Sequence, residues 1–158
     1  MKSIISYSRY TICITVIIFA VLFIGCIATV KIEYLFFPFL ASYLILINYA
    51  LIYGAAYIKA DNQNIILGSI LKSKRIPISN VKSIELFKPT MGAIIICASG
   101  GFMGYRGIFR EGDIGRYYGF YGKASDCFLI RLKNGDKYVL GCKQPDKMVD
   151  YIKSHLHP

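Results

Sequence analysis

The sequence predicts a membrane-anchored α+β protein, in which an N-terminal transmembrane helical hairpin precedes an antiparallel β-barrel or sandwich capped by a C-terminal α-helix. Three observations predict this fold class. Two long segments, residues 11–30 and 34–58, contain no charged residue. Short segments with alternating apolar and polar residues follow them, as in half-buried strands. The chain then ends in a segment with apolar residues at helical spacing, which is typical of an amphipathic helix.

The two uncharged segments have the length of membrane-spanning helices. An α-helix rises ~1.5 Å per residue, so residues 11–30 span about 30 Å, the thickness of the hydrocarbon core of a bilayer. Only three residues separate the two segments, so the chain turns back at once. We therefore assign residues 1–58 to a hairpin with helices at about 11–30 and 34–58, and residues 59–158 to a cytoplasmic domain.

The distribution of positive charge predicts the orientation of this hairpin. Lys2 and Arg9 precede the first helix and Lys59 follows the second, whereas Lys31 and Glu33 nearly cancel in the turn between them. Cytoplasmic segments of membrane proteins carry an excess of Lys and Arg. We therefore expect a multi-pass protein of the inner cell membrane with both termini in the cytoplasm.

The second helix carries one strongly polar side chain, Asn48, at mid-membrane depth. We expect this helix to begin near Pro38, because a proline in the first turn of a helix sacrifices no hydrogen bond. Small and polar residues let membrane helices approach closely and hydrogen-bond to each other. The helix segment has five of them: Ser42, Asn48, Gly54, Ala55 and Ala56. Asn48 is therefore a candidate interaction residue, and the alternative is that it fixes the second helix to the first.

From residue 57 onward the sequence has the pattern of short strands. Residues 1–10 are expected to be an interfacial lead-in and not a strand. Ile84 and Leu86 alternate with polar neighbours, as expected of a half-buried strand. The expected strands are residues 57–60, 64–69, 74–77, 82–88, 93–98, 116–123, 128–133 and 137–142.

A glycine-dense segment, residues 99–107, interrupts these strands and is expected to be a loop, because glycine makes the backbone permissive. It also carries Phe102, Met103 and Tyr105. Apolar side chains on such a loop need a surface to cover, and that surface is the core of the domain, the bilayer or another protein. These three residues are therefore candidate interaction residues.

The last two expected strands form a hairpin whose register follows from its apolar residues. A two-residue turn is one alternative. A three-residue loop with Gly135 in the left-handed conformation instead pairs Ile130 with Tyr138 and Phe128 with Leu140. Only the second register collects the apolar residues on one face, so it is the one we predict.

A C-terminal helix is expected to begin near Pro145, because proline is favoured in the first turn of a helix. Its apolar residues form one stripe at helical spacing. The stripe consists of Met148, Val149, Ile152 and Leu156. We expect it to cover the open end of the strand layer.

The sequence lacks the residue patterns of common catalytic and metal-binding sites. It contains no nucleophile elbow, zinc-protease motif or phosphate-binding loop, and its five cysteines form no CxxC pair. We therefore expect no enzymatic activity, no cofactor and no metal. The many tyrosines are explained better as sheet residues than as a platform for stacking bases, so we expect no nucleic acid partner.

The expected domain is basic, since residues 59–158 hold 16 Lys or Arg against 8 Asp or Glu. Beside a membrane such a domain attracts anionic headgroups. The alternative is that its charge only reflects the general excess of Lys and Arg on the cytoplasmic side. Lys72, Lys74 and Arg75 cluster at the turn after the first expected hairpin, and they are candidate ligands of lipid headgroups.

Several stretches resemble the bacterial PH-like (pleckstrin-homology-like) membrane proteins with an N-terminal two-helix hairpin. Residues 75–84, RIPISNVKSI, resemble the R-I-P-I-x-x-I-x-x-I stretch of that group, and residues 101–107, GFMGYRG, resemble its glycine–aromatic segment. Residues 129–142 and the QPD that soon follows resemble its last hairpin and helix start. The resemblance covers most of residues 57–156, and it implies a small antiparallel β-barrel or sandwich plugged by a helix.

The resemblance does not carry over phosphoinositide binding at the residue level. Eukaryotic PH domains often bind phosphoinositides through basic residues around the first hairpin, but here Lys59 is followed by Asp61, Asn62 and Gln63. Two functions are left open. One is a non-enzymatic protein-interaction or scaffolding module, acting on an unknown partner or through self-association, and the other is a sensor of anionic lipid or envelope stress. A self-protection or immunity-type membrane protein has the same architecture, and no residue selects it.

Overall fold

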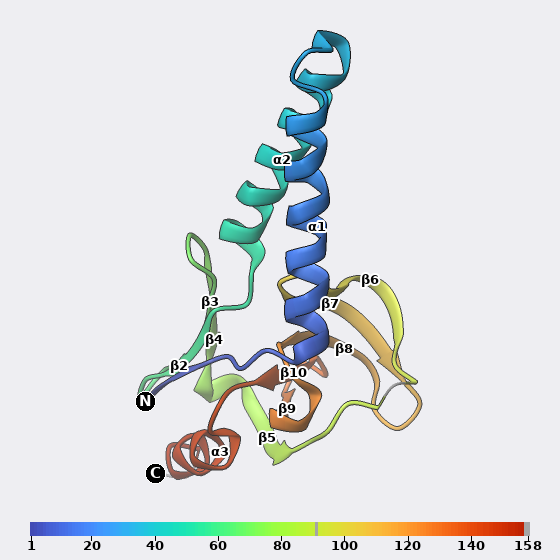
Figure 1. Cartoon of the computed structure of the whole chain (residues 1–158). Coiled ribbons are helices and arrows are strands. Elements are labelled where there is room, and N and C mark those ends of the chain that lie inside the picture. The colour runs from blue at the N-terminus through green and yellow to red at the C-terminus, as the bar shows by residue number, and fades with distance from the viewer. Residues whose placement is uncertain (91, 157–158) are drawn as a thin grey trace.

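The computed structural model describes residues 1–90 and 92–156, which form a helical hairpin standing on a β-rich domain (Figure 1). The hairpin consists of α1 (Arg9–Ala28) and α2 (Glu33–Tyr53). By length and composition, both helices are candidate membrane spans. Only Thr11 in α1 and Ala50 in α2 are buried, so most of their apolar surface faces outward. Helices that are apolar all round need an apolar environment, which the interior of a bilayer provides.

The second helix begins close to the predicted residue 34, but it begins before Pro38 and ends before the predicted residue 58. α2 begins at Glu33, so Pro38 lies inside the helix and the expected start near Pro38 is wrong. The acidic side chain of Glu33 suits the positive end of the helix dipole, which favours the earlier start. α2 ends at Tyr53, before the expected end at residue 58, because Gly54 is extended (φ −57°, ψ 131°) and leads into a strand.

A four-stranded sheet begins at the N-terminus and continues where the hairpin ends. Its strands are β1 (Lys2–Ile4), β2 (Tyr57–Ala60), β3 (Asn64–Gly68) and β4 (Ser73–Pro77), antiparallel in that order. Residues 2–4 are thus a strand and not the expected interfacial lead-in, since Ser3 pairs with Ile58. The terminal amino group of Met1 donates to the carbonyl of Ala60 (2.6 Å) and fixes the end of the chain to β2.

A six-stranded sheet packs against the first one. Its strands are β5 (Val81–Leu86), β6 (Ile94–Gly101), β7 (Gly104–Glu111), β8 (Gly115–Tyr121), β9 (Cys127–Leu132) and β10 (Lys137–Gly141). The strand order is β5-β9-β10-β8-β7-β6, and among the strands of residues 1–90 and 92–156 only β8 and β10 pair in parallel. The two sheets form a sandwich and not a closed barrel.

The predicted register of the last hairpin is confirmed. Ile130 pairs with Tyr138, Phe128 pairs with Leu140, and Gly135 has a φ of 91°. The alternating side chains of β9 therefore serve two cores, one on each face of the sheet. Phe128 and Ile130 face the four-stranded sheet, whereas Leu129 joins a second cluster on the opposite face.

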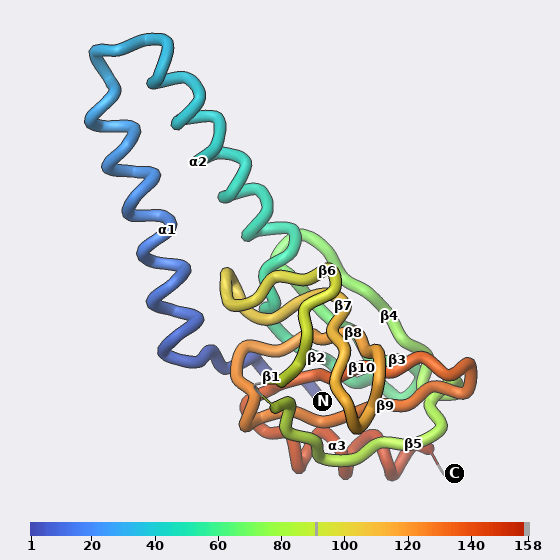
Figure 2. The backbone as a smooth tube through the Cα atoms, turned by 90° about the vertical axis from the view of Figure 1, so that its right-hand side faces the viewer, coloured from blue at the N-terminus to red at the C-terminus, as the bar shows by residue number. Residues whose placement is uncertain are grey.

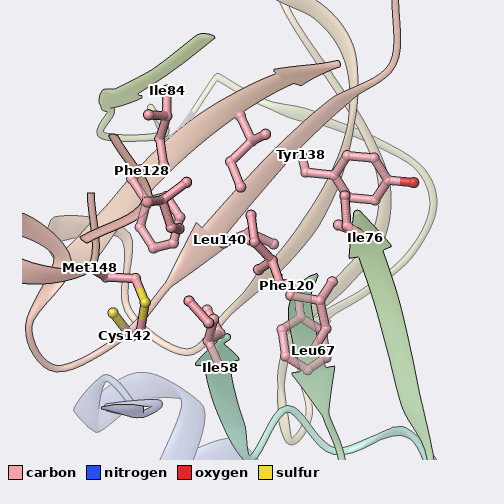
Figure 3. Packing of buried hydrophobic residues seen from close by; sticks show 14 of the residues in the cluster. Ile58, Leu67, Ile76, Ile84, Phe120, Phe128, Tyr138, Leu140, Cys142 and Met148 are labelled. Atoms are coloured by element: carbon pink, nitrogen blue, oxygen red, sulfur yellow. The ribbon is translucent and has the colours of Figure 1, made fainter. Parts of the chain in front are cut away.

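The main core lies between the two sheets and under α3 (Pro145–Ser154), as Figure 3 shows. Phe120, Phe128 and Leu140 are almost completely buried. The predicted stripe of α3 packs there through Met148, Val149 and Ile152, which are buried, while Leu156 at the end is partly exposed. Burying one such side chain stabilises the fold by about 1.5–3 kcal/mol, so α3 is an integral part of the domain.

The glycine-dense segment is an ordered β-hairpin and not the expected loop. β6 and β7 pair from Ile94–Arg110 to Gly101–Gly104, with one irregularity between Ile95 and Cys97, and Phe102 and Met103 form the turn between them. Gly101, Gly104 and Gly107 all have positive φ, at 127°, 99° and 130°. The glycines are therefore required by the path of the backbone and do not indicate a lack of structure.

We expect Gly107→Ala to destabilise the β6–β7 hairpin. A Cβ at this position would lie 2.3 Å from the carbonyl oxygen of Cys97 and 2.5 Å from the Cα of Ala98, both backbone atoms. The positive φ alone costs an alanine on the order of 1–3 kcal/mol. Thermal unfolding of the purified full-length protein measures the loss. The matched control is Gly112→Ala, because no atom lies within 4 Å of its added Cβ; equal melting temperatures for the two variants would contradict this account.

Candidate functional site

The side chain of Arg106 on β7 connects three parts of the molecule. Its Nε donates a hydrogen bond to the hydroxyl of Tyr118 on β8 (3.0 Å). Its Nη1 donates to the backbone carbonyl of Tyr53 at the end of α2 (2.8 Å) and to Oγ of Ser69, which follows β3 (2.7 Å). Arg106 therefore joins the second helix of the hairpin to both sheets.

Aromatic rings surround the same guanidinium group. The Cζ atom of Arg106 lies 5.2 Å from the ring centre of Tyr53 and 5.3 Å from that of Phe120. A cation over an aromatic face is attracted by the ring quadrupole, with about 0.5–2 kcal/mol per contact depending on how far it is desolvated. These contacts hold the half-buried charge of Arg106 in place without an acidic partner.

Two lysines lie beside Arg106. The Nζ of Lys74 donates to the hydroxyl of Tyr138 (3.0 Å) and lies 4.8 Å from the ring centres of both Tyr118 and Tyr138. The Nζ of Lys72 lies 5.6 Å from the ring centre of Tyr53. We call this group the cation–aromatic cluster, and it consists of Lys72, Lys74, Arg106, Tyr53, Tyr118 and Tyr138.

The cluster carries three positive charges and no negative charge. Among the described residues, the ion pairs are Lys59–Asp61, Lys123–Asp126 and Arg131–Glu85, and none belongs to the cluster. Like charges at short range repel, so an anion bound among them lowers the free energy. The Nη2 atom of Arg106 makes no hydrogen bond to any described residue. Its two N–H groups are therefore available to donate hydrogen bonds to an anion.

The structure separates the three residues expected to bind headgroups. Lys72 and Lys74 belong to the cation–aromatic cluster, whereas Arg75 is exposed and its side chain makes no hydrogen bond or cation–π contact with the cluster among the described residues. The alternation of side chains along β4 explains this difference, because Lys74 and the buried Ile76 share the face toward the other sheet. Sequence reasoning missed Arg106, although it is the first charged residue after the uncharged segment 89–105.

Phe102 and Met103, two of the expected interaction residues, lie against the hairpin of their own chain. The ring of Phe102 is 5.7 Å from that of Phe19 on α1 and 6.1 Å from that of Tyr49 on α2, between ring centres. The backbone N–H of Met103 donates to Oγ1 of Thr15 (3.1 Å). The surface that these apolar side chains cover is therefore formed by α1 and α2.

The other two expected interaction residues lie apart from this contact. Tyr105 stacks on Tyr121 with ring centres 5.0 Å apart and belongs to the periphery of the second core. Asn48 lies on the exposed side of α2, where its Nδ2 donates to the carbonyl of Leu44 in the same helix (2.9 Å). The structure thus brings Phe102 and Met103 together but not Tyr105 or Asn48.

The first helix is fixed to the domain at its base. Oγ1 of Thr11 donates to the carbonyl of Gly122 (3.4 Å), and the backbone N–H of Ser8 donates to the same carbonyl (3.0 Å). The hydroxyl of Tyr7 donates to the carbonyl of Ala55, and burial raises the pKa of Tyr7. Hydrogen bonds therefore hold both segments that connect the hairpin to the domain, the one before α1 and the one after α2.

No group of three or more His, Cys, Asp or Glu side chains that suits a metal ion occurs within residues 1–90 and 92–156. Cys127 and Cys142 are buried, and burial raises the pKa of both thiols. Both are therefore protonated at neutral pH, a state that neither binds metal nor reacts as a nucleophile.

A comparison with protein families places a match to the bacterial PH domain over residues 56–156. The chain belongs to the bacterial PH domain family. The matched region begins directly after α2 and includes α3, so both sheets except β1 fall within the PH domain. PH domains are generally non-catalytic modules. Searches of curated proteins and of solved structures return no match to the chain.

The buried thiols predict a loss of stability at alkaline pH. Because burial raises the pKa of Cys127 and Cys142 in the folded chain, their contribution is complete below the ordinary thiol pKa of 9.0 and declines as the pH rises above it. Each thiol lowers the free energy of unfolding by up to about 1.4 kcal/mol per pH unit. Tyrosines with raised pKa, such as Tyr117 (about 12, mainly through burial), add to this only at higher pH.

Melting temperatures measured between about pH 8 and pH 10, below the ordinary tyrosine pKa, test this prediction. The variant Cys127→Ala is expected to show a shallower decline than the natural protein, since one of the two titrating groups is removed. A decline of the same slope in both proteins would rule out Cys127 as a cause.

Proposed function

We propose that this PH-family protein is a non-enzymatic module anchored at the inner face of a bacterial membrane, and that its cation–aromatic cluster binds the anionic headgroups of lipids around the hairpin. Both termini and the PH domain lie in the cytoplasm in this proposal. One observation carries it: Lys72 and Arg106 lie over the ring of Tyr53, the last residue of α2, and Lys74 lies over the ring of Tyr118, to whose hydroxyl Arg106 donates. No acidic side chain among the described residues pairs with these three cations.

The position of the cluster along the hairpin supports a headgroup as the ligand. The turn between β3 and β4 rises beside the end of α2 (Figure 1). There the backbone N–H of Leu71 donates to the carbonyl of Leu51 (3.1 Å), so Lys72 lies next to the last turn of the helix. Tyrosine at the end of a membrane helix is typical of the headgroup level. Lipid phosphates therefore come within reach of Lys72, Lys74 and Arg106.

The chemistry of the cluster also suits a phosphate. The planar guanidinium group of an arginine binds phosphate through two parallel hydrogen bonds, and Arg106 keeps its Nη2 donors free of protein partners among the described residues. Its other donors hold it in one orientation, so little conformational entropy is lost on binding. Each lysine near an anionic surface adds about 1 kcal/mol of attraction.

The double variant Lys72→Gln/Lys74→Gln is expected to lose preference for anionic lipid. At about 1 kcal/mol per lysine, the preference falls roughly fivefold for each charge removed. Native mass spectrometry of the full-length protein in detergent, titrated with phosphatidylglycerol against phosphatidylcholine, measures the bound fraction of each lipid.

The matched control is Lys147→Gln/Lys153→Gln, which removes the same charge from the exposed side of α3, far from the hairpin. This control should retain the preference of the natural protein. Equal losses in both double variants would mean that net charge alone attracts the lipid, and no preference in the natural protein would end the proposal.

A second candidate function is the assembly of a membrane complex through α2. Asn48, Ser42 and Ile45 are exposed on this helix. The Oδ1 atom of Asn48 accepts no hydrogen bond from any described residue. Polar groups without partners are costly in an apolar environment, and side chains of this kind hydrogen-bond across helices in membranes. A second copy of the chain or another membrane protein provides such a helix.

Asn48→Leu is expected to weaken this association by about 0.6–2 kcal/mol, the range of interhelical hydrogen bonds in membranes. Cross-linking of the full-length protein at increasing dilution in lipid vesicles gives the association constant. Asn48→Gln, which keeps the amide, should retain most of it. An association that is the same in the leucine variant would show that Asn48 serves only its own helix.

A further inference from the structure

We infer that the free edge strand β6 and the turn between β3 and β4 insert their apolar side chains into the membrane beside the hairpin. One edge of the domain then lies in the headgroup–acyl boundary, and the domain is not held away from the membrane surface. The inference rests on the membrane anchoring proposed above, but it concerns a different surface with a different chemistry. We call this surface the apolar rim, and its members are Ile70, Leu71, Ile94, Ile95 and Ile96.

The strand β6 has the composition of a lipid-facing segment. No charged residue occurs between Lys88 and Arg106. Ile94, Ile95 and Ile96 are 64%, 52% and 47% exposed, although β6 is an edge strand with only β7 as its neighbour. Edge strands of soluble sheets are normally protected by charges, proline or very short length. The eight residues of β6 include no charge and no proline, and the strand departs from regular pairing only between Ile95 and Cys97, so most of this edge needs another cover.

The turn between β3 and β4 supplies the rest of the rim. Ile70 and Leu71 are 64% and 67% exposed, among the most exposed large apolar residues outside the helices. Their position along the axis of α2 is fixed, because the backbone N–H of Leu71 donates to the carbonyl of Leu51 in the last turn of that helix. If α2 spans the bilayer, these two side chains lie where its acyl chains end.

The position of β6 along the axis of α1 also indicates that this strand lies at the headgroup–acyl boundary. In both views the strands of the larger sheet follow one another from β5, farthest from the hairpin, to β6, which lies beside the lower part of α1 (Figures 1 and 2). Ile12 and Val16 of α1 are 51% and 60% exposed there. The end of β6 lies higher still, since Met103 binds Thr15 and Phe102 packs on Phe19. Lipid that covers the exposed face of α1 therefore reaches the end of β6 next to this turn, and the strand continues from there along the edge of the sheet to Ile94.

The depth of insertion is limited by the backbone of β6. Its outer N–H and C=O groups pair with no other strand, and each such group costs several kcal/mol in hydrocarbon. At the headgroup boundary, water satisfies them while the isoleucine side chains reach about 5–10 Å into the acyl region. Exposed cations lie next to this edge, because Arg110 pairs with Ile94 and Lys88 precedes the strand. Such cations favour anionic headgroups.

A second copy of the chain is a less suitable cover for β6. Two identical edge strands that extend one sheet are related by a two-fold axis that reverses the direction in which the strands are stacked. Here that direction runs toward the hairpin (Figures 1 and 2). Edge pairing would thus point the two hairpins in opposite directions, which one membrane with a single orientation of the protein does not permit. Lipid covers the apolar rim and requires no opposite orientation of a second copy.

Site-specific fluorescence in lipid vesicles tests the inference. The exposed or partly exposed cysteines Cys13, Cys26 and Cys97 are replaced by serine, and the buried Cys127 and Cys142 stay unlabelled in a folded chain. An environment-sensitive probe is attached to Ile95→Cys or Ile70→Cys in the full-length protein. Ile17→Cys in α1 reports on the hairpin, and Lys82→Cys on β5 reports on the far edge of the same sheet. Lipids with a nitroxide on the upper acyl chain, and aqueous iodide, serve as quenchers.

The inference predicts blue-shifted emission and quenching by the nitroxide lipids at positions 95, 70 and 17, with quenching by iodide alone at position 82. If 17 is quenched by lipid but 95 and 70 behave like 82, the anchoring stands and the inserted rim is wrong. If 17 is not quenched by lipid either, the anchoring fails and the inference fails with it. Shielding of 95 from both quenchers would show that a protein covers β6, which also overturns the inference.

Discussion

The interaction on which the arrangement of the molecule depends is the one between Arg106 and the end of α2. The last carbonyls of a helix have no donor within the helix, and a cation near that end also interacts favourably with the helix dipole. Arg106 donates to the carbonyl of Tyr53 and stacks against its ring. The same guanidinium group binds Ser69 and Tyr118. One side chain therefore connects the end of the second helix to both sheets. An Arg without an acidic partner is held there by neutral groups alone, which leaves its charge available to an anion.

The hairpin and the PH domain therefore form one mechanical unit. α1 enters through Tyr7, Ser8 and Thr11, all bound to carbonyls of the domain, and the turn of the β6–β7 hairpin packs between the two helices. β1 adds a strand to the first sheet before α1 begins, so the helix is bounded by the domain on both sides of its base. If the two candidate spans cross a bilayer, a tilt of the helices must move the sheets with them. In the proposed membrane anchoring, this rigidity keeps one face of the domain toward the membrane.

Local periodicity was sufficient to predict the hairpin, the last β-hairpin with its register and the apolar stripe of α3, because each depends on neighbours within a few residues. The errors lie where distant pairing decides. Lys2–Ile4 has no strand signal of its own and becomes a strand only because β2 offers an edge. The glycines of residues 101–107 look like a loop until β6 and β7 pair along their length. Only part of the candidate site could be predicted from the sequence. Lys72 and Lys74 are recognisable as a basic cluster. Arg106, however, binds Tyr53, which lies 53 positions away in the sequence, and no local pattern indicates that contact.

The excess of positive charge has two physical explanations, and the positions of the charges distinguish them. A rule of membrane topology needs only that Lys and Arg stay on the cytoplasmic side, wherever they lie on the domain. It accounts for Lys147 and Lys153 on the exposed side of α3. It does not require Lys72 of the β3–β4 turn and Arg106 of β7 to converge on the ring of Tyr53, where α2 ends. Nor does it require Lys74 of β4 to lie over the ring of Tyr118, to whose hydroxyl Arg106 donates. Nor does it require the apolar rim to lie directly beside them, at Ile70 and Leu71. An apolar layer followed by a cationic one, both at the end of a candidate membrane helix, matches the order of acyl chain and phosphate in a lipid leaflet.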